Sequence, residues 1–376
     1  MIEVKQVRTW REQREFLNFP LDLYAGNPNF IPPLDIDERK IFRKDYVYND
    51  CCDSVCFLAL KDGVVAGRIQ GIVQKASNEK RSERRARFCR FDAVDDPAVS
   101  AALFQAVEQW ALQEGMDTLC GPLGFSDLER EGLLIEGFDQ QATFEENYNA
   151  EYYQHHIEAL GFEKEVDWLG FRLYGPEGEE TLQELEDLTA FIFRRYKLHF
   201  GPSDSTSDFL KRYADGIFAL LDTSYEQLYG TVPFTEGMKK LMLDNFRLIV
   251  DPKYTAVILD ENDRVICFGV AFASLSQALA LTRGRLTPRT AVRLLRCLKR
   301  PVGLDLGLVG VDPEYLNRGV SAVFSAAIMK MLRDNPRIRY ADTNLNLEDN
   351  YAIINQWRRF RKEQVKRYRS YVKKLK

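Results

Sequence analysis

The sequence predicts a mixed α/β protein made of two successive domains that repeat the same order of elements. The 376-residue chain is longer than the roughly 250–300 residues at which single cores stop growing. Hairpin signals and amphipathic helical segments alternate, and the order helix, hairpin, strand, helix, strand, helix, strand occurs twice. We place the boundary at the start of a polar stretch, which gives domains 1–175 and 176–376.

The first domain begins with a helical pattern at 4–24, followed by a loop rich in Pro and Asn. Two strands come next, joined by Lys61-Asp62-Gly63, where glycine supplies the positive φ of a tight turn. The charged stretch 77–87 is expected to be a loop. The remaining elements are a strand at 88–94, a helix after Asp96-Pro97, a strand at 116–123, a helix at 149–160 and a strand pair at 162–174.

The second domain begins with a linker at 175–188 that runs into a new helix. The elements expected after it are two helical segments up to about 249, a strand pair at 254–275, an insertion at 287–301, a strand at 302–311, a helix at 317–335, a strand at 339–346, a helix near 350–361 and a strand at 365–375.

Composition excludes several classes of function. The net charge of −4 argues against a surface built as a whole for nucleic acid. No apolar run is long enough to span a bilayer and no secretory signal is visible, so we expect a cytoplasmic protein without a membrane partner. The one cysteine cluster, Cys51, Cys52 and Cys56, has no histidine near it in sequence, and we expect no metal site.

The stretch "LGLVGVDPEYLNRGVSAVFSAAI" contains the strongest signal for a ligand. A strand end, then Gly319, then a helix start offers unpaired backbone N–H groups at the positive end of the helix dipole. Glycine lets a phosphate approach the backbone closely, and Arg318 adds a cation beside it. A plain strand-to-helix turn is the alternative interpretation.

This stretch resembles the acyl-CoA loop of the GNAT superfamily of N-acyltransferases, which has the form Arg/Gln-x-x-Gly-x-Gly/Ala. The stretch "YYQHHIEALGFEKEVDWLGFRLY" is similar to the family's last helix and final strands, and the order of elements resembles two tandem GNAT domains. The resemblance implies two mixed, mostly antiparallel sheets flanked by helices. It implies binding of acetyl-CoA or another acyl-CoA at Val311, Arg318, Gly319, Val320 and Ser321.

The sequence departs from the family pattern in both halves. Leu316 stands where the family has Arg or Gln, and Ser321 stands where it has the last Gly or Ala. The equivalent stretch of the first half, "DAVDDPAVSAALF", has no glycine, and its three aspartates would repel a pyrophosphate. We therefore expect acyl-CoA only in the second half.

Acyl transfer to an amine needs a base for the amine and an acid for the departing thiolate. The tyrosine that the family uses as acid corresponds to Ile157 in the first half and Trp357 in the second. The candidates that remain are Glu314 and Asp342 as bases, and Tyr351 or Tyr315 in place of the missing acid.

Three hypotheses follow. The first is an acyl-CoA-dependent N-acyltransferase that acts on a small amine. The second is a non-catalytic ligand-binding or scaffold protein that keeps the fold, since the tyrosines are missing. The third is an aminoacyl-tRNA-dependent transferase, suggested by the basic and aromatic tail "RRFRKEQVKRYRSYVKKLK", although its alternation is typical of a strand with one solvated face.

Two further features have an open interpretation. The glycine-rich stretch 121–139 and the aromatic stretch 144–153 could form a pocket wall or could simply pack irregularly. Either His155 or His156 could serve as a base, but adjacent helical residues point about 100° apart, so both cannot face one ligand.

Overall fold

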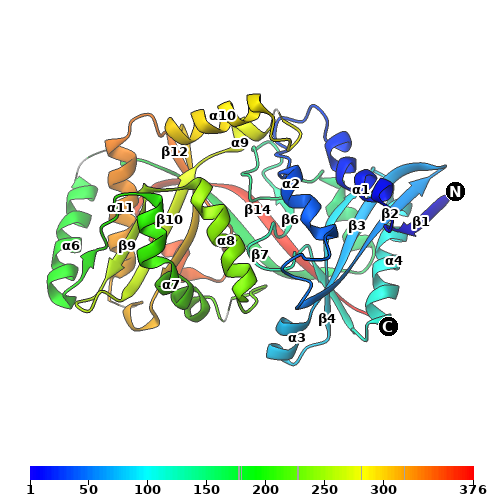
Figure 1. Cartoon of the computed structure of the whole chain (residues 1–376), viewed down its shortest axis with the longest axis horizontal. Helices are drawn as coiled ribbons and strands as arrows, with labels where there is room; N and C mark the ends of the chain where they lie inside the picture. The colour runs from blue at the N-terminus through cyan, green and yellow to red at the C-terminus, as the bar shows by residue number, and fades with distance from the viewer. Residues whose placement is uncertain (177, 179, 227, 281, 317) are drawn as a thin grey trace. The chain divides into compact units, whose positions relative to one another are not determined.

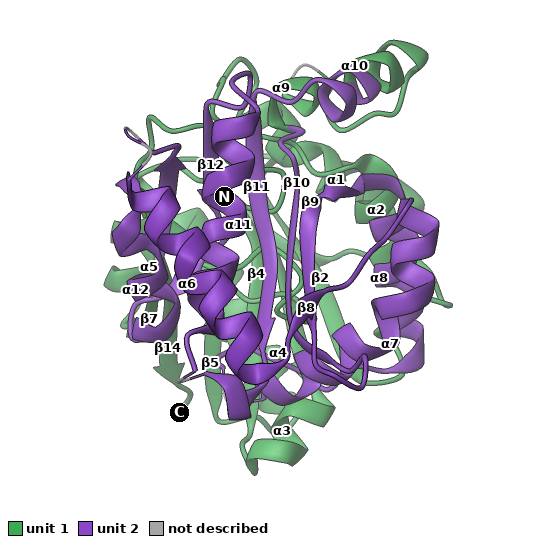
Figure 2. Cartoon of the chain, turned by 90° about the vertical axis from the view of Figure 1, so that its left-hand side faces the viewer, with its two compact units in different colours: residues 1–168, 276–293, 366–376 green, residues 169–275, 294–365 purple. Residues whose placement is uncertain are grey.

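The computed structural model describes residues 1–176, 178, 180–226, 228–280, 282–316 and 318–376. The chain forms two compact units, and each unit is a mainly antiparallel sheet flanked by helices (Figures 1 and 2). Unit 1 contains residues 1–168, 276–293 and 366–376, and unit 2 contains 169–275 and 294–365. This architecture confirms the predicted fold class. The domain boundary at 175 stays a prediction.

The sheet of unit 1 has the strand order β1-β2-β3-β4-β5-β14, with β6 also paired to β14. Helix α4 packs on β1, β2 and β3, where Gly71 leaves room for the ring of Trp110. The elements are β1 Ile2–Gln6, α1 Trp10–Leu23, α2 Asp35–Glu38, η1 Arg39–Phe42, β2 Cys52–Lys61, β3 Val64–Gln74, α3 Lys75–Arg81, β4 Arg85–Ala93, α4 Pro97–Gln113, β5 Thr118–Gly121, β6 Leu133–Glu136, α5 Tyr152–Ala159, α9 Ser276–Leu279 and the greater part of β14 Arg361–Lys374.

The sheet of unit 2 has the strand order β7-β12-β11-β10-β9-β8, with β13 also paired to β7. The elements are β8 His199–Phe200, β9 Val250–Leu259, β10 Val265–Ala273, β11 Gly303–Val311, β12 Tyr340–Thr343, β13 Asn346–Leu347, α6 Glu180–Tyr196, α7 Thr206–Ser224, α8 Glu236–Ile249, α11 Val320–Asp334, α12 Tyr351–Gln356, η2 Pro313–Tyr315 and η3 Trp357–Arg359. Strand β7 Glu163–Tyr174 and helix α10 Pro288–Lys299 begin in unit 1 and end in unit 2.

Three expectations from the sequence are wrong in detail. Residues 4–24 are not one helix: strand β1 pairs antiparallel with β2, and α1 begins only after its N-cap Thr9. Residues 77–87 are not a plain loop, because Gln74 caps a short helix, α3, with its side-chain oxygen. Residues 162–174 form one long strand, β7, where we expected a strand pair.

Helix α11 is fixed on the sheet of unit 2 by close packing. Figure 2 shows α6 and α11 side by side over this sheet, and the core beneath them includes Leu304 and the α11 residues Val323, Phe324 and Ile328. The Phe324 ring lies directly on the backbone of β10 at Gly269, where any Cβ would overlap it. A glycine in the strand therefore lets the helix approach closely.

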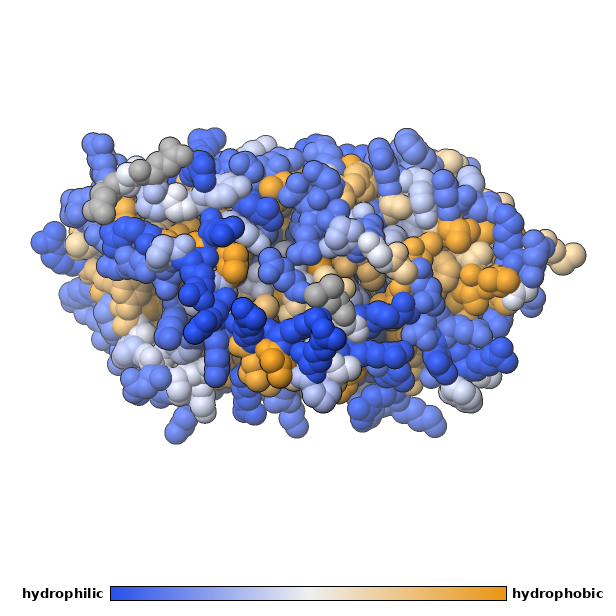
Figure 3. Space-filling view, turned by 90° about the horizontal axis from the view of Figure 1, so that it is seen from above, coloured by the Kyte–Doolittle hydropathy of each residue, from blue (hydrophilic) through white to orange (hydrophobic). Residues whose placement is uncertain are grey.

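None of the helices in the described ranges combines the length and the apolar character needed to cross a membrane. The face seen in Figure 3 is mostly hydrophilic, with apolar patches between the charged side chains.

We expect Gly269→Ala to lower the free energy of unfolding by about 3 kcal/mol, because the added methyl group overpacks a buried contact. Urea denaturation followed by circular dichroism measures the change. Gly175→Ala is the matched control, since a Cβ there meets Leu332 at an ordinary 3.6 Å.

The double variant Gly269→Ala/Phe324→Leu tests the cause, because a smaller side chain relieves the overlap. Its stability should exceed the value obtained by adding the two single effects. Strict additivity would show that the Phe324 ring is not what limits residue 269.

Candidate functional site

The central strand of unit 2 leaves its parallel neighbour part of the way along its length. Strand β11 pairs with β12 over Gly303–Leu306, and from Val309 to Val311 it is paired with β10 on the other side. Past Leu306, the backbone groups on the β12 side of β11 therefore form no pairing with β12. An extended ligand can pair with such an edge through its amide groups.

A β-bulge lies directly after the point of separation. The register changes from Gly269↔Val309 to Ala271↔Leu306, so Val270 faces two residues of β11. Unit 1 repeats the arrangement: β4 pairs with β5 only as far as Arg87, and the register change that follows opposes Ile69 to Arg90 and Phe91. Bulges are common next to active sites because they redirect backbone and side-chain groups.

The turn after β11 ends in a glycine that starts helix α11. Gly319 has φ +80°, a conformation that favours glycine, and within the described residues it gives α11 an N-cap without a side-chain hydrogen bond. The N–H of Ala322 donates to the Gly319 carbonyl at 2.9 Å, so the N–H groups of Val320 and Ser321 are the ones in the first turn that solvent or a ligand could bind. In unit 1 the corresponding helix α4 is capped by the Asp96 carboxylate, which accepts from the N–H of Ala98 at 2.9 Å.

The cation next to this glycine has no carboxylate partner among the residues that the structure describes. The guanidinium of Arg318 lies over the rings of Tyr315 and Tyr196, 4.8 and 5.4 Å from their centroids. The nearby carboxylate Asp312 accepts instead from Arg264, at 2.9 Å. The turn therefore presents an exposed positive charge beside bare helix N–H groups, which suits an anion.

The other predicted binding residues contribute backbone and not side chains. Val311 and Val320 are buried in the apolar core beneath the turn, together with Ile192 of α6. Ser321 is half-buried in the first turn of α11, and its carbonyl accepts from Ser325. The structure thus brings Val311, Arg318, Gly319, Val320 and Ser321 into one turn.

The predicted catalytic residues do not converge. Glu314 lies in the same turn and its side chain is 71% exposed, 3.9 Å from Arg264. Asp342 is buried on β12 and accepts two hydrogen bonds from Arg172, at 2.7 and 2.8 Å. It pairs with Asp305, so it lies at the opposite end of β11 from Val311, roughly 20 Å away along the strand. Tyr351 is exposed at the start of α12.

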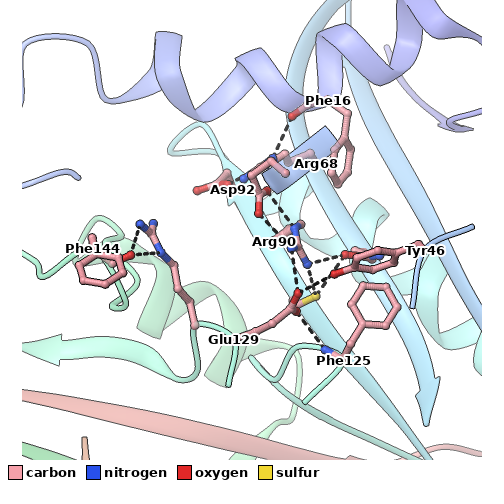
Figure 4. Close-up of polar contacts among 12 residues, drawn as sticks. Phe16, Tyr46, Arg68, Arg90, Asp92, Phe125, Glu129 and Phe144 are labelled. Atoms are coloured by element: carbon pink, nitrogen blue, oxygen red, sulfur yellow. Dashed lines mark hydrogen bonds and ion pairs between the residues drawn. The ribbon is translucent and has the colours of Figure 1, made fainter. Parts of the chain in front are cut away.

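The equivalent place in unit 1 holds an ionic cluster that is partly buried, with side chains 13–19% exposed, and Figure 4 shows it in part. Arg90, the bulge residue of β4, has φ +46° and donates to Glu38 through two hydrogen bonds of 3.0 Å. It also donates to Gln70 at 2.8 Å and lies 3.5 Å from Glu129. Tyr46 donates to Glu129 at 3.3 Å. The guanidinium thus lies at the bulge of β4, at the place that corresponds to the bulge of β11 in unit 2.

The cluster depends on the charge of Glu38. Burial would raise the pKa of Glu38, but the neighbouring Arg90, helped by Arg68 and Arg130, lowers it to about 2. Beside the cluster, Arg68 donates to Asp92 at 2.8 Å and to the carbonyl of Phe16 at 3.0 Å. Asp92, expected to repel a phosphate, is thus already paired.

The glycine-rich stretch 121–139 lies largely inside unit 1. Leu123 and Phe125 are almost fully buried, and Phe125 stacks on Tyr48 with 5.2 Å between centroids. Glu131 is buried in the same stretch, burial raises its pKa well above the usual range, and its Oε1 has no partner among the described atoms. Sequence reasoning missed Glu131, Glu38 and Arg90, because nothing local distinguishes them from surface charges.

Three other features that the sequence singled out can be located in the structure. His156 is buried, with Nδ1 2.9 Å from the Ser100 hydroxyl, while His155 is exposed. Among the described residues no group of Cys, His, Asp and Glu could hold a metal ion. Basic residues of β14 form ion pairs within unit 1: Lys366 with Glu146, Arg367 with Glu136, Arg369 with Asp167 and Lys373 with Glu108.

Comparison with known structures identifies the fold. A tandem GNAT protein from the clavulanic acid biosynthesis pathway aligns with all of this chain and 99% of its own, with a TM-score of 0.59 and 12% identity. A GCN5-related N-acetyltransferase from Sphaerobacter thermophilus aligns with all of this chain and 96% of its own, with a TM-score of 0.52 and 10% identity. The chain therefore has the tandem GNAT fold, as the resemblance in sequence implied.

Two curated proteins are similar in sequence over most of their length. Protein YghO of Escherichia coli K12 is 28% identical, over 98% of this chain and 95% of that protein. The bacterial ceramide synthase of Caulobacter vibrioides is 26% identical, over 89% of this chain and 86% of that protein. No protein-family model matches the chain.

We expect Glu38→Gln to cost roughly 3 kcal/mol of stability near neutral pH, since it leaves the largely buried Arg90 without its main counter-charge. The folded pKa of about 2 lies below the usual 4.5, so Glu38 stabilises the fold fully above pH 4.5. That contribution is lost as the pH falls from about 4.5 towards 2. Urea titrations at neutral and acidic pH should show the two proteins converging on acidification.

Asp37→Asn is the control, because Asp37 forms a more exposed pair with Lys40 and should contribute less than about 1 kcal/mol. If Glu38→Gln and Asp37→Asn cost the same at neutral pH, the cluster does not hold unit 1 together.

Proposed function

We propose that this protein is an acyl-CoA-dependent N-acyltransferase whose donor binds at the turn between β11 and α11. The observation that carries the proposal is the N-terminus of α11, which is capped by Gly319 and flanked by Arg318, with no side chain on its first N–H groups in the described part of the chain. The pyrophosphate of acetyl-CoA or a longer acyl-CoA would bind there. Its pantetheine amides would pair with the edge of β11 that β12 leaves beyond Leu306, where they would replace the bond that the Val309 carbonyl accepts from the Tyr225 hydroxyl at 3.0 Å.

The proposed reaction is a direct transfer. The amine nitrogen attacks the thioester carbonyl, the C–S bond breaks, and the proton lost by the amine ends on the CoA thiol. The bulge of β11 supports this placement, because it interrupts regular pairing where a thioester following the strand edge would lie. Glu314 is our candidate to accept the amine proton, since it is the only predicted base in the same turn. Asp342 and Tyr351 remain less favoured candidates.

The acceptor class is suggested by a relative. A ceramide is an amide of a long-chain amino alcohol, so a protein called a ceramide synthase forms the bond that we propose here. We therefore extend the expected acceptors from small amines to long-chain amines. The acyl chain of the donor is a second variable, and long-chain acyl-CoA belongs in every assay beside acetyl-CoA.

The non-catalytic alternative keeps one specific observation in its favour. Trp357, at the position of the family's tyrosine, is buried and donates through Nε1 to Asn346 at 3.3 Å. It is a structural residue and cannot protonate a thiolate. The tRNA hypothesis loses support, because the basic side chains of β14 are paired within unit 1.

The binding test compares Gly319→Asp with Gly319→Asn by calorimetric titration of acetyl-CoA and a long-chain acyl-CoA. Both side chains impose similar strain at φ +80°, and both lie near Ile192. Only aspartate places a negative charge beside the pyrophosphate. We expect Gly319→Asp to bind at least about tenfold more weakly than Gly319→Asn.

Gly161→Asp controls for the backbone conformation, because Gly161 has φ +82° in an open position of unit 1. It should bind like the unchanged protein. Binding that is equal in the aspartate and asparagine variants would contradict the proposed donor site. Donor binding without thiol release across small and long-chain amines would favour the non-catalytic alternative.

A further inference from the structure

Helix α10 exposes a broad face to solvent. Among the described residues of the helix, Thr290 alone is fully buried, and Leu294, Cys297 and Leu298 are half-buried. Two large apolar side chains face solvent on the opposite side, with Val292 66% and Leu295 54% exposed. Leu286 before the helix and Val302 after it are exposed as well. We call residues 285–302 the α10 surface.

The α10 surface carries positive charge alone. The sequence has no Asp or Glu from residue 276 to 303. Arg289, Arg293, Arg296 and Arg300 recur at i, i+4, i+7 and i+11, so they form one stripe along the helix. In the described chain none of these four has an ion-pair partner, which contrasts with the paired basic residues of β14.

The apolar and basic residues occupy adjacent stripes. At about 100° per residue, Val292 and Leu295 lie on the exposed side between the arginine stripe and the side that faces the protein. Figure 3 looks onto this face, where deep-blue side chains gather around orange ones over α10. A helix with a basic stripe beside exposed Val and Leu suits the boundary between lipid headgroups and acyl chains.

The segment before α10 is anchored to its own unit. Arg283 donates to the Asp22 carboxylate at 2.6 Å and to the Leu21 carbonyl at 3.1 Å. The carbonyl of Gly284 accepts from the N–H of Asp35 at 2.9 Å, and a Cβ at Gly284 would collide with the Pro33 carbonyl. These contacts hold the start of the α10 surface in place, so it need not fold upon binding.

Apolar surface continues beyond the helix in unit 2. Leu298 lines a shallow depression of about 190 Å³ together with Leu248 and Tyr254. Leu248, at the end of α8, is 74% exposed. Single exposed apolar residues are normal on a protein surface, but several that lie close together mark an interaction site.

We propose that the α10 surface binds the headgroup region of an anionic membrane. The helix would lie in the plane of the interface, with Val292 and Leu295 inserted and the arginine stripe on lipid phosphates. This differs from our expectation of no membrane partner, which rested on the lack of a spanning segment. A nucleic acid would use the arginines but would leave the apolar stripe in water. A basic protein partner is not favoured, because the α10 surface has no acidic group to pair with it.

The test is cosedimentation of the whole protein with vesicles made of equal parts phosphatidylglycerol and phosphatidylcholine, and with phosphatidylcholine alone. We expect binding to the anionic vesicles that weakens as salt is added. Replacing Arg289, Arg293, Arg296 and Arg300 with glutamine should weaken binding about fivefold for each residue. Val292→Ser/Leu295→Ser should weaken it at least about tenfold.

Val64→Ser/Leu112→Ser is the matched control, because both residues are exposed on unit 1 and outside the α10 surface. It should bind like the unchanged protein, and circular dichroism should show all variants folded. Failure to bind anionic vesicles would overturn the proposal. Loss of binding in the arginine variant with full binding in Val292→Ser/Leu295→Ser would also overturn it, in favour of a polyanion such as a nucleic acid.

Discussion

The organisation of unit 2 depends on one constraint, which is the place where β11 separates from β12. Because the two strands pair only over Gly303–Leu306, the rest of β11 pairs with β10 and accepts a hydrogen bond from Tyr225 at the Val309 carbonyl. Helix α11 begins after the turn that follows β11. Its position on the sheet is fixed by the contact between Phe324 and Gly269. The bulge, the strand edge that β12 leaves and the helix N-terminus without a capping side chain in the described residues therefore follow one another along the chain.

The two units use the same backbone arrangement with opposite electrostatics. In unit 1 the bulge carries Arg90, whose charge is matched by Glu38 and Glu129, and the Asp96 carboxylate caps α4. An anion would meet fixed negative charge there. In unit 2 the bulge contains Gly307 and Leu308, and α11 begins without a capping side chain in the described residues. Removing one partner of the unit 1 cluster leaves an uncompensated charge, so the cluster keeps Arg90 and its carboxylates together at the bulge of β4.

The sequence was informative where the signal is local. The strand end, the φ of Gly319 and the start of α11 are encoded within a few residues, so the turn could be predicted. Strand β1 could not be predicted, because only its pairing with β2, about 55 residues away in sequence, distinguishes it from the start of a helix. The ion pairs Glu38–Arg90 and Asp342–Arg172 could not be predicted either, because their two residues lie 52 and 170 positions apart in sequence. Asp342 was a reasonable candidate base from its strand position alone, and its bidentate pair was invisible in the sequence.

The position of α10 in the chain bears on how a membrane contact and a soluble donor could be combined. Val302 ends the α10 surface and Gly303 begins β11, so the basic helix joins the end of β11 that pairs with β12. The proposed donor turn follows the other end of the strand, roughly 26 Å away at 3.3 Å per residue. A helix lying in the interface inserts only about 5–10 Å. With β11 directed away from the membrane, the turn at Gly319 would stay in water when α10 binds lipid, open to a water-soluble thioester, while a long-chain amine would reach the protein from the membrane.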